Sequence, residues 1–217
     1  MLLSGVEEGA VVITDDQYAG KGQAGKVWQS SPYNNLTFSL ILKPRLFRPQ
    51  EQFRVTMAVS LAIVDVLLDY LPGELKIKWP NDIYFGGKKI AGILIESNLK
   101  GKTVESFIIG VGLNVNQKEF SGLNATSLVN EIGSTQDLNE LFNQLYVSIA
   151  NRYGQVVGNP TAALKKQYNE LLLDLNQERL FNDGQNFKGT ILGTDPMGRL
   201  IVNTETGQRS FMNNEIS

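Results

Sequence analysis

The sequence predicts an α+β fold, with strands and amphipathic helices around one core and a small β-rich unit after them. Three observations support this. Apolar residues alternate with period two near residue 40, they recur at helical spacings in three later segments, and glycine turns separate short strands beyond residue 176. With 217 residues, 42% of them hydrophobic, the chain suffices for one sizeable core and one small appended unit. We therefore expect a main domain over residues 1–175 and a terminal domain over residues 176–217.

The first part of the main domain is expected to be a strand, a loop, a second strand and a helix. The strands are predicted over 10–14 and 36–42, the second of them half-buried, and the loop over 20–28 is rich in glycine. Asn35 is expected in the turn before the second strand. Apolar side chains between 53 and 68 recur at spacings of three and four, so this segment is predicted to be a helix with a buried face.

Four further strands are expected in the middle of the chain. Pro80 marks the end of the first, because proline cannot donate to a strand ladder and biases the residue before it, Trp79, toward an extended conformation. Trp79 itself is expected in the core, while Asn81 and Asp82 are offered on the turn. The pair Gly86–Gly87 is typical of a two-residue hairpin. The four strands are predicted over 75–79, 83–85, 89–96 and 106–115.

Helical spacing returns at the end of the main domain. One helix is expected from Leu138 to Ile149, with a capping box between Ser134 and Asp137, and another from Pro160 to Leu175. The terminal domain then has the pattern of a small β-barrel. Its turn signals fall at 183–184, 195–198 and 206–207.

The loop over residues 20–28, Gly-Lys-Gly-Gln-Ala-Gly-Lys-Val-Trp, combines three glycines, two lysines and an indole. Glycine has no Cβ, so its amide can approach a ligand closely, and exposed amides beside lysines favour an anion. The loop therefore predicts a phosphate cradle. A flexible surface loop is the alternative.

Lys88 and Lys89 begin a strand that is apolar on both faces, so alternation does not decide which lysine points inward. Strict alternation groups Lys89 with Ala91 and Ile93. It groups Lys88 with Gly92. A lysine held against a core needs an anionic partner, so we expect a carboxylate or a bound anion beside it. An exposed lysine pair at a hairpin tip is the alternative.

The sequence contains neither histidine nor cysteine, which excludes histidine bases, thiol nucleophiles, disulfides and ordinary zinc sites. The remaining polar groups suit phosphoryl and nucleotidyl transfer, where catalysis is mainly positioning and charge neutralisation. A net charge of −2 argues against direct binding to nucleic acid. The chain has no signal-like start and no apolar run long enough to span a bilayer, so we expect a cytoplasmic protein.

Five sequence blocks together resemble the biotin protein ligase family, and they occur in the family's order. They are residues 20–28, 35–39, 78–82, 89–96 and 109–116. A weaker likeness continues at 193–200. The resemblance implies a class II synthetase-like fold, in which helices flank a mixed β-sheet and a small SH3-like β-barrel follows.

The resemblance also implies a two-step reaction. Biotin and ATP condense to biotinyl-5′-adenylate, with Mg²⁺ on the phosphates, and the biotin then passes to a lysine of a biotin carboxyl carrier protein, a subunit of acetyl-CoA carboxylase. Bringing a carboxylate against an α-phosphate forces two anions together, so such a site must supply positive charge and preorganised amides.

The resemblance implies roles for the residues of this sequence that match the family's site residues. Lys89, Lys21 and Asp82 are implied to be catalytic, and Asp82 is also implied to hold the metal or to orient the incoming amine. The implied biotin contacts are Gln17, Lys21, Gly22, Gln23, Lys89, Gly92 and Gly112. Trp28 matches the adenine-stacking position, and the other implied nucleotide contacts are Asn81, Lys89 and Asn114.

The sequence departs from the family in two places. The family's loop is richer in arginine, whereas Gln23 is uncharged and lysine lacks the guanidinium fork, so the adenylate is expected to be held less tightly unless another residue compensates. No Ser-Thr-Asn segment precedes residues 11–14. The chain therefore looks N-terminally short, without the DNA-binding domain of bifunctional relatives, and weaker biotin binding is expected.

Two other functions stay open at the level of the sequence. A lipoate or octanoate ligase or transferase would share the fold, and a non-catalytic biotin-binding or nucleotide-binding regulatory protein would share the ligand site. A homodimer through an exposed sheet edge is also left open.

Overall fold

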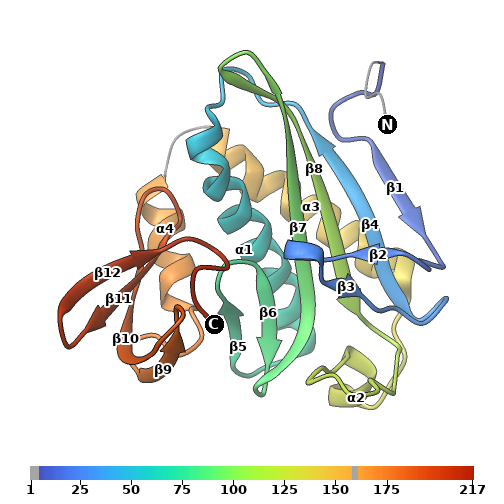
Figure 1. Ribbon diagram of the computed structural model, residues 1–217. Helices are drawn as coiled ribbons and strands as arrows, with labels where there is room; N and C mark the ends of the chain where they lie inside the picture. The colour runs from blue at the N-terminus through green and yellow to red at the C-terminus, as the bar shows by residue number, and fades with distance from the viewer. Residues whose placement is uncertain (1–4, 158–160) are drawn as a thin grey trace.

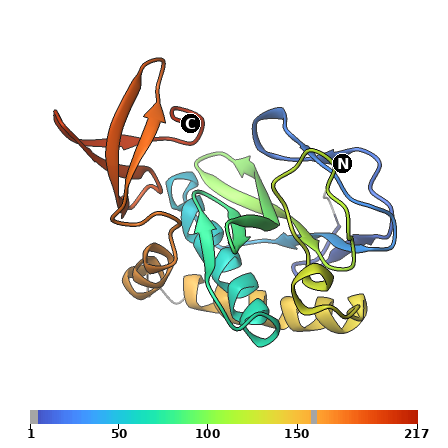
Figure 2. The same ribbon diagram turned by 90° about the horizontal axis from the view of Figure 1, so that it is seen from below.

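The computed structural model describes residues 5–157 and 161–217. Its centre is a six-stranded sheet, covered by helices on one face (Figures 1 and 2). All neighbouring strands in this sheet are antiparallel. The strand order is β1 (Val11–Thr14), β4 (Asn35–Leu42), β8 (Thr103–Asn114), β7 (Lys88–Lys100), β6 (Asp82–Phe85) and β5 (Leu75–Lys78).

This architecture confirms the expected α+β fold with a helix-flanked sheet. Parallel pairing, which a mixed sheet requires, is limited in the described ranges to isolated bridges, including Ile77 with Leu172 and Lys89 with Ala125. The Gly86–Gly87 hairpin is also confirmed. Both glycines have positive φ, 54° and 76°, as a tight turn between β6 and β7 requires.

Helix α1 (Gln52–Tyr70) is the centre of the core. Twelve of its nineteen residues are buried, because it packs against β5, β6 and β7 on one side and against α3 (Leu138–Val157) and α4 (Thr161–Glu170) on others. The sequence predicted one buried face, and the helix is buried on more than one side. A short helix, α2 (Leu128–Ile132), and a 3₁₀ turn, η2 (Pro49–Glu51), are further helical elements of this domain.

Two helix ends differ from their predictions. Asp137 caps α3 by itself, since its Oδ1 accepts hydrogen bonds from the amides of Asn139 and Glu140 at 2.8 and 3.0 Å, and no capping box with Ser134 forms. Helix α4 ends at Glu170 rather than Leu175. The residues after it turn back to β5, where they are held by hydrogen bonds to Ile77. Pro160 lies outside the described residues.

The start of β4 also differs from its prediction. Seven of its eight residues are buried, so it is not half-buried. Asn35 is the first residue of this strand and is not in a turn. Its side-chain Nδ2 donates to Gln117 Oε1 at 2.6 Å, and its Oδ1 accepts the Val115 amide at 3.0 Å. These bonds tie the start of β4 to the segment that follows β8.

The C-terminal domain is a four-stranded antiparallel sheet with its turns where the sequence predicted them. Its order is β12 (Gly207–Phe211), β11 (Leu200–Thr204), β10 (Asn186–Thr194) and β9 (Glu178–Asn182). After β12 the chain returns to β9, where Ser217 and Asn182 exchange two backbone hydrogen bonds of 3.0 and 3.1 Å. The tail thereby joins the two edges of the sheet, as in a small barrel.

The C-terminal domain is docked on the main domain through Trp79. The half-buried indole Nε1 of Trp79 donates to Gly198 O at 2.9 Å. Gly198 packs so closely on Phe53 that an added Cβ would lie 2.7 Å from the Phe53 Cβ. Trp79 therefore packs at the edge of the core, as expected, and also joins the two domains.

Candidate active site

The face of the sheet opposite the helices is hollow in the middle. Across β1, β4, β8, β7 and β6, the residues facing one another in register are Thr14, Thr37, Gly112, Gly92 and Asp82. Residues in one such row share a face, so two adjacent glycines leave the floor without side chains. The cavity above this floor has a volume of about 1010 Å³, at the upper end of ligand sites.

All eleven site residues named from the sequence line this one cavity. They come from the loop after β1, from the turn between β5 and β6, and from β6, β7 and β8, segments that are far apart in the sequence. They are Gln17, Lys21, Gly22, Gln23, Trp28, Asn81, Asp82, Lys89, Gly92, Gly112 and Asn114.

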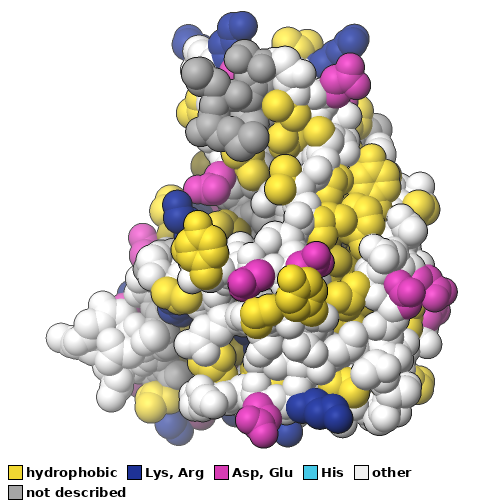
Figure 3. All heavy atoms as spheres, turned by 90° about the vertical axis from the view of Figure 1, so that its right-hand side faces the viewer, with side chains coloured by type: hydrophobic (Ala, Val, Ile, Leu, Met, Phe, Trp, Pro, Cys, Tyr) yellow, Lys and Arg dark blue, Asp and Glu magenta, His cyan; other side chains and the backbone are white. Residues whose placement is uncertain are grey.

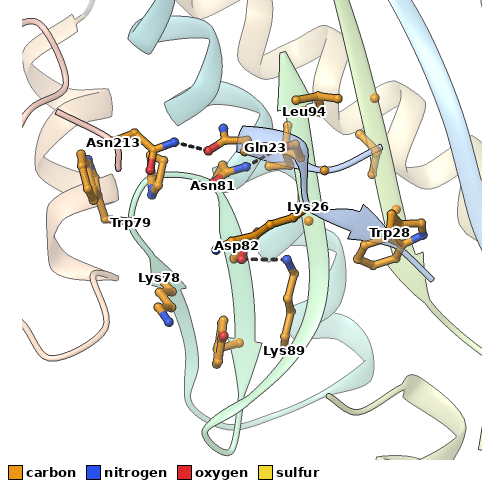
Figure 4. Close-up of a pocket in the computed structure, with 18 of the residues that line it drawn as sticks. Gln23, Lys26, Trp28, Lys78, Trp79, Asn81, Asp82, Lys89, Leu94 and Asn213 are labelled. Atoms are coloured by element: carbon orange, nitrogen blue, oxygen red, sulfur yellow. Dashed lines mark hydrogen bonds and ion pairs between the residues drawn. The ribbon is translucent and has the colours of Figure 1, made fainter. Parts of the chain in front are cut away.

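Lys89 is paired with Asp82, at 2.7 Å between Nζ and Oδ2 (Figure 4). The expected anionic partner is therefore a carboxylate. Strict alternation grouped Lys89 with Ala91, and this is wrong, because a bulge shifts the register between β6 and β7 so that Ile83 faces Ala91 while Tyr84 faces Lys89. The bulge brings Lys89 onto the cavity face.

The backbone of Lys89 is held from the side by the segment that follows β8. The Lys89 amide donates to Asn124 O at 3.1 Å, and the Thr126 amide donates to Lys89 O at 2.9 Å. Asn114 Nδ2 in turn donates to Thr126 O at 3.0 Å. Residues 124–126 therefore link Lys89 to the end of β8 and fix where its side chain starts.

The glycine loop forms a small hairpin over the cavity, made of β2 (Gly20–Lys21), the 3₁₀ turn η1 (Gln23–Gly25) and β3 (Val27–Trp28). The Gly22 amide donates to Lys26 O at 2.7 Å, which closes the hairpin. Within residues 5–157 and 161–217, Lys21 and Lys26 have no carboxylate partner in an ion pair. Figure 4 shows Lys26 reaching toward Asp82. The loop thus presents free positive charge to the cavity.

Trp28 lies directly on the glycine floor. An added Cβ at Gly112 would lie 2.6 Å from Trp28 Cζ2 and 2.8 Å from its Nε1, so only glycine allows this packing. Lys89 Nζ lies 5.7 Å from the centre of the Trp28 ring, within cation–π range. The indole Nε1 is buried without a hydrogen-bond acceptor in the described residues.

The two asparagines at the cavity differ in their free hydrogen-bonding groups. Asn81 and Ile93 are joined twice, because Asn81 Nδ2 donates to Ile93 O and the Ile93 amide donates to Asn81 O at 3.2 Å. Asn114, by contrast, has a buried Oδ1 with no donor among the described residues. A buried acceptor of this kind is costly to leave unpaired, so Asn114 is suited to receive a ligand donor.

Positive charge predominates in the described lining of the cavity. Five cations, Lys21, Lys26, Lys78, Lys89 and Arg179, face three carboxylates, Asp82, Glu96 and Asp174. Burial raises the pKa of Tyr84, and the Asp82 carboxylate raises it further. The phenol of Tyr84 is therefore neutral at neutral pH and able to donate a hydrogen bond.

The cavity also has walls that the sequence motifs did not reveal. Phe120 and Leu123 come from the segment after β8, and Arg179 and Asn213 come from the C-terminal domain. None of them lies in a recognisable motif, and the distance in sequence hides their proximity. Thr37 and Ser39 also line the cavity. In β4 these polar residues alternate with apolar ones. This alternation is the local sequence signal that places Thr37 and Ser39 on the face away from the helices.

A metal site built by protein alone is not found in the part of the chain that the structure describes. No group of three His, Cys, Asp or Glu side chains comes together there. The carboxylate of Asp82 forms an ion pair with Lys89.

Among the described helices, none has the length and apolar character to cross a membrane.

Comparisons with known proteins agree with this geometry. The biotin/lipoate A/B protein ligase family matches residues 1–114, and the biotin protein ligase C-terminal domain matches residues 175–217. The chain is 31% identical to the bifunctional ligase/repressor BirA of Bacillus subtilis, over 96% of this chain and 66% of that protein. It therefore spans about two thirds of that relative's length.

Two further relatives match over most of both chains. The chain is 30% identical to the biotin--[acetyl-CoA-carboxylase] ligase of Paracoccus denitrificans, covering 96% of this chain and 90% of that one. The solved biotin protein ligase of Aquifex aeolicus in complex with biotin and ATP superposes with a TM-score of 0.84 at 26% identity, over 98% of this chain and 89% of that one. The chain therefore belongs to the biotin/lipoate A/B protein ligase family and carries a biotin protein ligase C-terminal domain.

Proposed function

We propose that this protein activates biotin with ATP as biotinyl-5′-adenylate and transfers the biotin to a lysine of a biotin carboxyl carrier protein. The Lys89–Asp82 pair beneath a glycine loop with two free lysines carries this proposal. Relatives named biotin--[acetyl-CoA-carboxylase] ligase and the superposable structure with biotin and ATP support it. Its carrier would then be the biotin carboxyl carrier subunit of an acetyl-CoA carboxylase.

In the first step, an oxygen of the biotin carboxylate attacks the α-phosphorus of ATP, the bond from that phosphorus to the bridging oxygen breaks, and pyrophosphate leaves. Lys89 and Lys21 would neutralise the carboxylate and the α-phosphate, and Gly22, which has no Cβ, would let a ligand lie close to the loop backbone. Mg²⁺ would arrive with the phosphates of the nucleotide, where it supplies further positive charge. With Asp82 engaged by Lys89, its proposed role is to orient Lys89 and the incoming amine.

In the second step, the ε-amine of the carrier lysine attacks the acyl carbon of the adenylate. The bond from this carbon to the phosphate oxygen breaks, AMP leaves, and the amine loses a proton. The reaction needs no histidine base, since the phosphate is already a good leaving group. This agrees with the absence of histidine from the chain.

The remaining site residues divide between the two substrates. We assign Gln17, Gly22, Gln23, Gly92 and Gly112 to biotin. Trp28, Asn81 and Asn114 are assigned to the nucleotide, and the unpaired Oδ1 of Asn114 suits an N–H donor of the base. Because Trp28 lies on Gly112, the two sets meet at the middle of the floor.

The test is exchange of labelled pyrophosphate into ATP, which reports the first step alone. We expect exchange that depends on biotin, and a loss of at least about 100-fold in Lys89→Met, because a charge placed at the reacting anions is removed. Lys88→Met is the matched control, since Lys88 is exposed on the same strand and outside the cavity. Exchange driven by lipoate in place of biotin would overturn the biotin assignment, and no exchange with either acid would overturn the enzymatic one.

A further inference from the structure

The tip of the glycine loop is tied to the C-terminal domain. Asn213 Nδ2 donates a hydrogen bond to Gln23 Oε1, and Figure 4 shows the two side chains meeting across the top of the cavity. Among the described residues, this is the hydrogen bond by which a side chain of residues 20–26 contacts another part of the protein. The other hydrogen bonds of the loop are internal, so they fix its shape. Trp28, packed on Gly112, anchors the end of the loop to the floor, and the bond from Asn213 holds its tip.

The backbone on both sides of Asn213 is held by hydrogen bonds. It follows β12 in a tight turn, where the Met212 amide donates to Glu215 Oε2 at 2.7 Å and the Glu215 amide donates to Met212 O at 3.1 Å. Beyond the turn, Ser217 is bonded to Asn182 of β9. The side chain of Asn213 therefore projects from a fixed turn, and little conformational entropy is lost when it meets Gln23.

The C-terminal domain in turn has fixed contacts with the main domain. Trp79 donates to Gly198 O at 2.9 Å, and Thr194 Oγ1 donates to Asn169 Oδ1 at 2.9 Å. Trp79 lies one proline away from Asn81 on the cavity wall. A continuous set of contacts thus leads from the cavity, through the C-terminal domain, back to the loop that covers the cavity.

We propose that Asn213 is a positioning residue that holds the glycine loop closed over the biotinyl-adenylate between the two steps. This inference depends on the proposed function above. Gln23 is neutral, so it contributes no charge to a phosphate; its bond to Asn213 provides retention by another route. Loss of one such neutral bond corresponds to about a 2–10-fold change in an equilibrium.

The first test detects the contact without using activity. The chain has no cysteine, so Gln23→Cys/Asn213→Cys carries the only two thiols. A short bis-maleimide is expected to join them within one chain, giving a single intramolecular cross-link by mass spectrometry. The control pair is Gln23→Cys/Gln208→Cys, since Gln208 is an exposed amide of β12 without a bond to the loop. Equal cross-linking of both pairs would overturn the proposed contact.

The second test measures retention of the intermediate. Adenylate formed from labelled biotin is isolated on the protein by rapid gel filtration, and its release is followed. We expect release to be about fivefold faster in Asn213→Ala, and pyrophosphate exchange to fall by a smaller factor, about twofold, because the same loop carries Lys21 into the first step. Asn213→Gln keeps the amide donor and is expected to restore part of the retention, while Gln208→Ala should release at the parent rate.

The two proposals fail in different ways. Unchanged release in Asn213→Ala, in a protein that exchanges pyrophosphate normally, would overturn the positioning role and leave the proposed function intact. Equal acceleration in Gln208→Ala would also overturn it, since that points to general loosening of the domain. If the parent protein forms no adenylate, the proposed function fails, and with it the positioning role; the cross-link then decides only whether the contact exists.

Discussion

At the scale of single residues, glycines decide how closely groups approach on the cavity floor. Gly112 and Gly110 lie two positions apart on β8 and face the same side. Gly112 is in contact with the Trp28 ring, whereas an added Cβ at Gly110 would meet Leu94 atoms only at 3.6 and 3.7 Å, an ordinary contact distance. The same strand therefore holds a site where a methyl group is excluded and one where it fits.

Gly112→Ala is expected to weaken nucleotide binding by about tenfold or more, because the methyl group displaces the indole and overpacking of this kind costs about 1–3 kcal/mol. Calorimetric titration with ATP measures the effect. Gly110→Ala is the control and should bind ATP like the parent. Equal affinity in the two variants would show that the position of Trp28 does not matter to the nucleotide.

At the scale of elements, the turn between β10 and β11 carries the docking contact of the C-terminal domain. Asp195 Oδ1 accepts the amides of Met197 and Arg199 at 2.8 and 2.9 Å, and its Oδ2 accepts Arg199 Nε at 2.6 Å. Burial alone raises the pKa of Asp195, but these hydrogen bonds and the guanidinium outweigh it and leave the pKa below its ordinary value of 3.8. The ionised carboxylate therefore stabilises the turn that presents Gly198 to Trp79.

Asp195→Ala is expected to lower the free energy of unfolding by about 1–3 kcal/mol at pH 7, because amides of the turn lose their acceptor. A lowered native pKa means that this stabilisation is complete above the unfolded pKa and is lost as the pH falls through the native pKa. The difference between parent and variant should therefore be constant above about pH 5 and shrink as the pH falls below about 4. Urea unfolding at several pH values measures it, and a difference that does not change with pH would contradict the role of the charge.

At the scale of the whole molecule, the two edges of the central sheet are not equivalent. The edge at β5 is covered, because Ile77 exchanges backbone hydrogen bonds with Leu171 and Leu173 at 2.7 and 2.9 Å. In the described chain, β1 pairs with β4 alone, and Ile13 is 44% exposed on it. Figure 3 shows hydrophobic side chains together with Asp and Glu gathered on this side of the molecule. The edge at β1 is therefore where the sheet is open to extension.

A homodimer, left open by the sequence, is predicted to form through β1. In a two-fold interface each substitution acts twice, so Ile13→Lys should weaken self-association by about tenfold or more through repulsion and desolvation. Analytical ultracentrifugation over a range of concentrations measures it. Val147→Lys, at an exposed apolar position on α3, is the control. A dimer equally tolerant of both substitutions would have to use another surface.

The local chemistry of the chain is enough to predict most of the elements and the membership of the cavity. Helical spacing, the Gly86–Gly87 turn and Pro80 act over a few residues, so their effects are readable without the fold. The family resemblance placed eleven residues that the structure does bring to one cavity. Their roles toward biotin and ATP, and the domain boundary near residue 176, stay predictions.

What local sequence could not decide depends on register and on contacts between distant segments. A bulge between β6 and β7 set which face Lys89 takes, and its partner Asp82 lies on the neighbouring strand. The bond from Asn213 to Gln23 joins residues 190 positions apart. The sequence by itself determined the elements, the charge and the chemical groups available; the tertiary structure decided which of them meet, because a one-residue change of register reverses a side chain and no short-range preference specifies it.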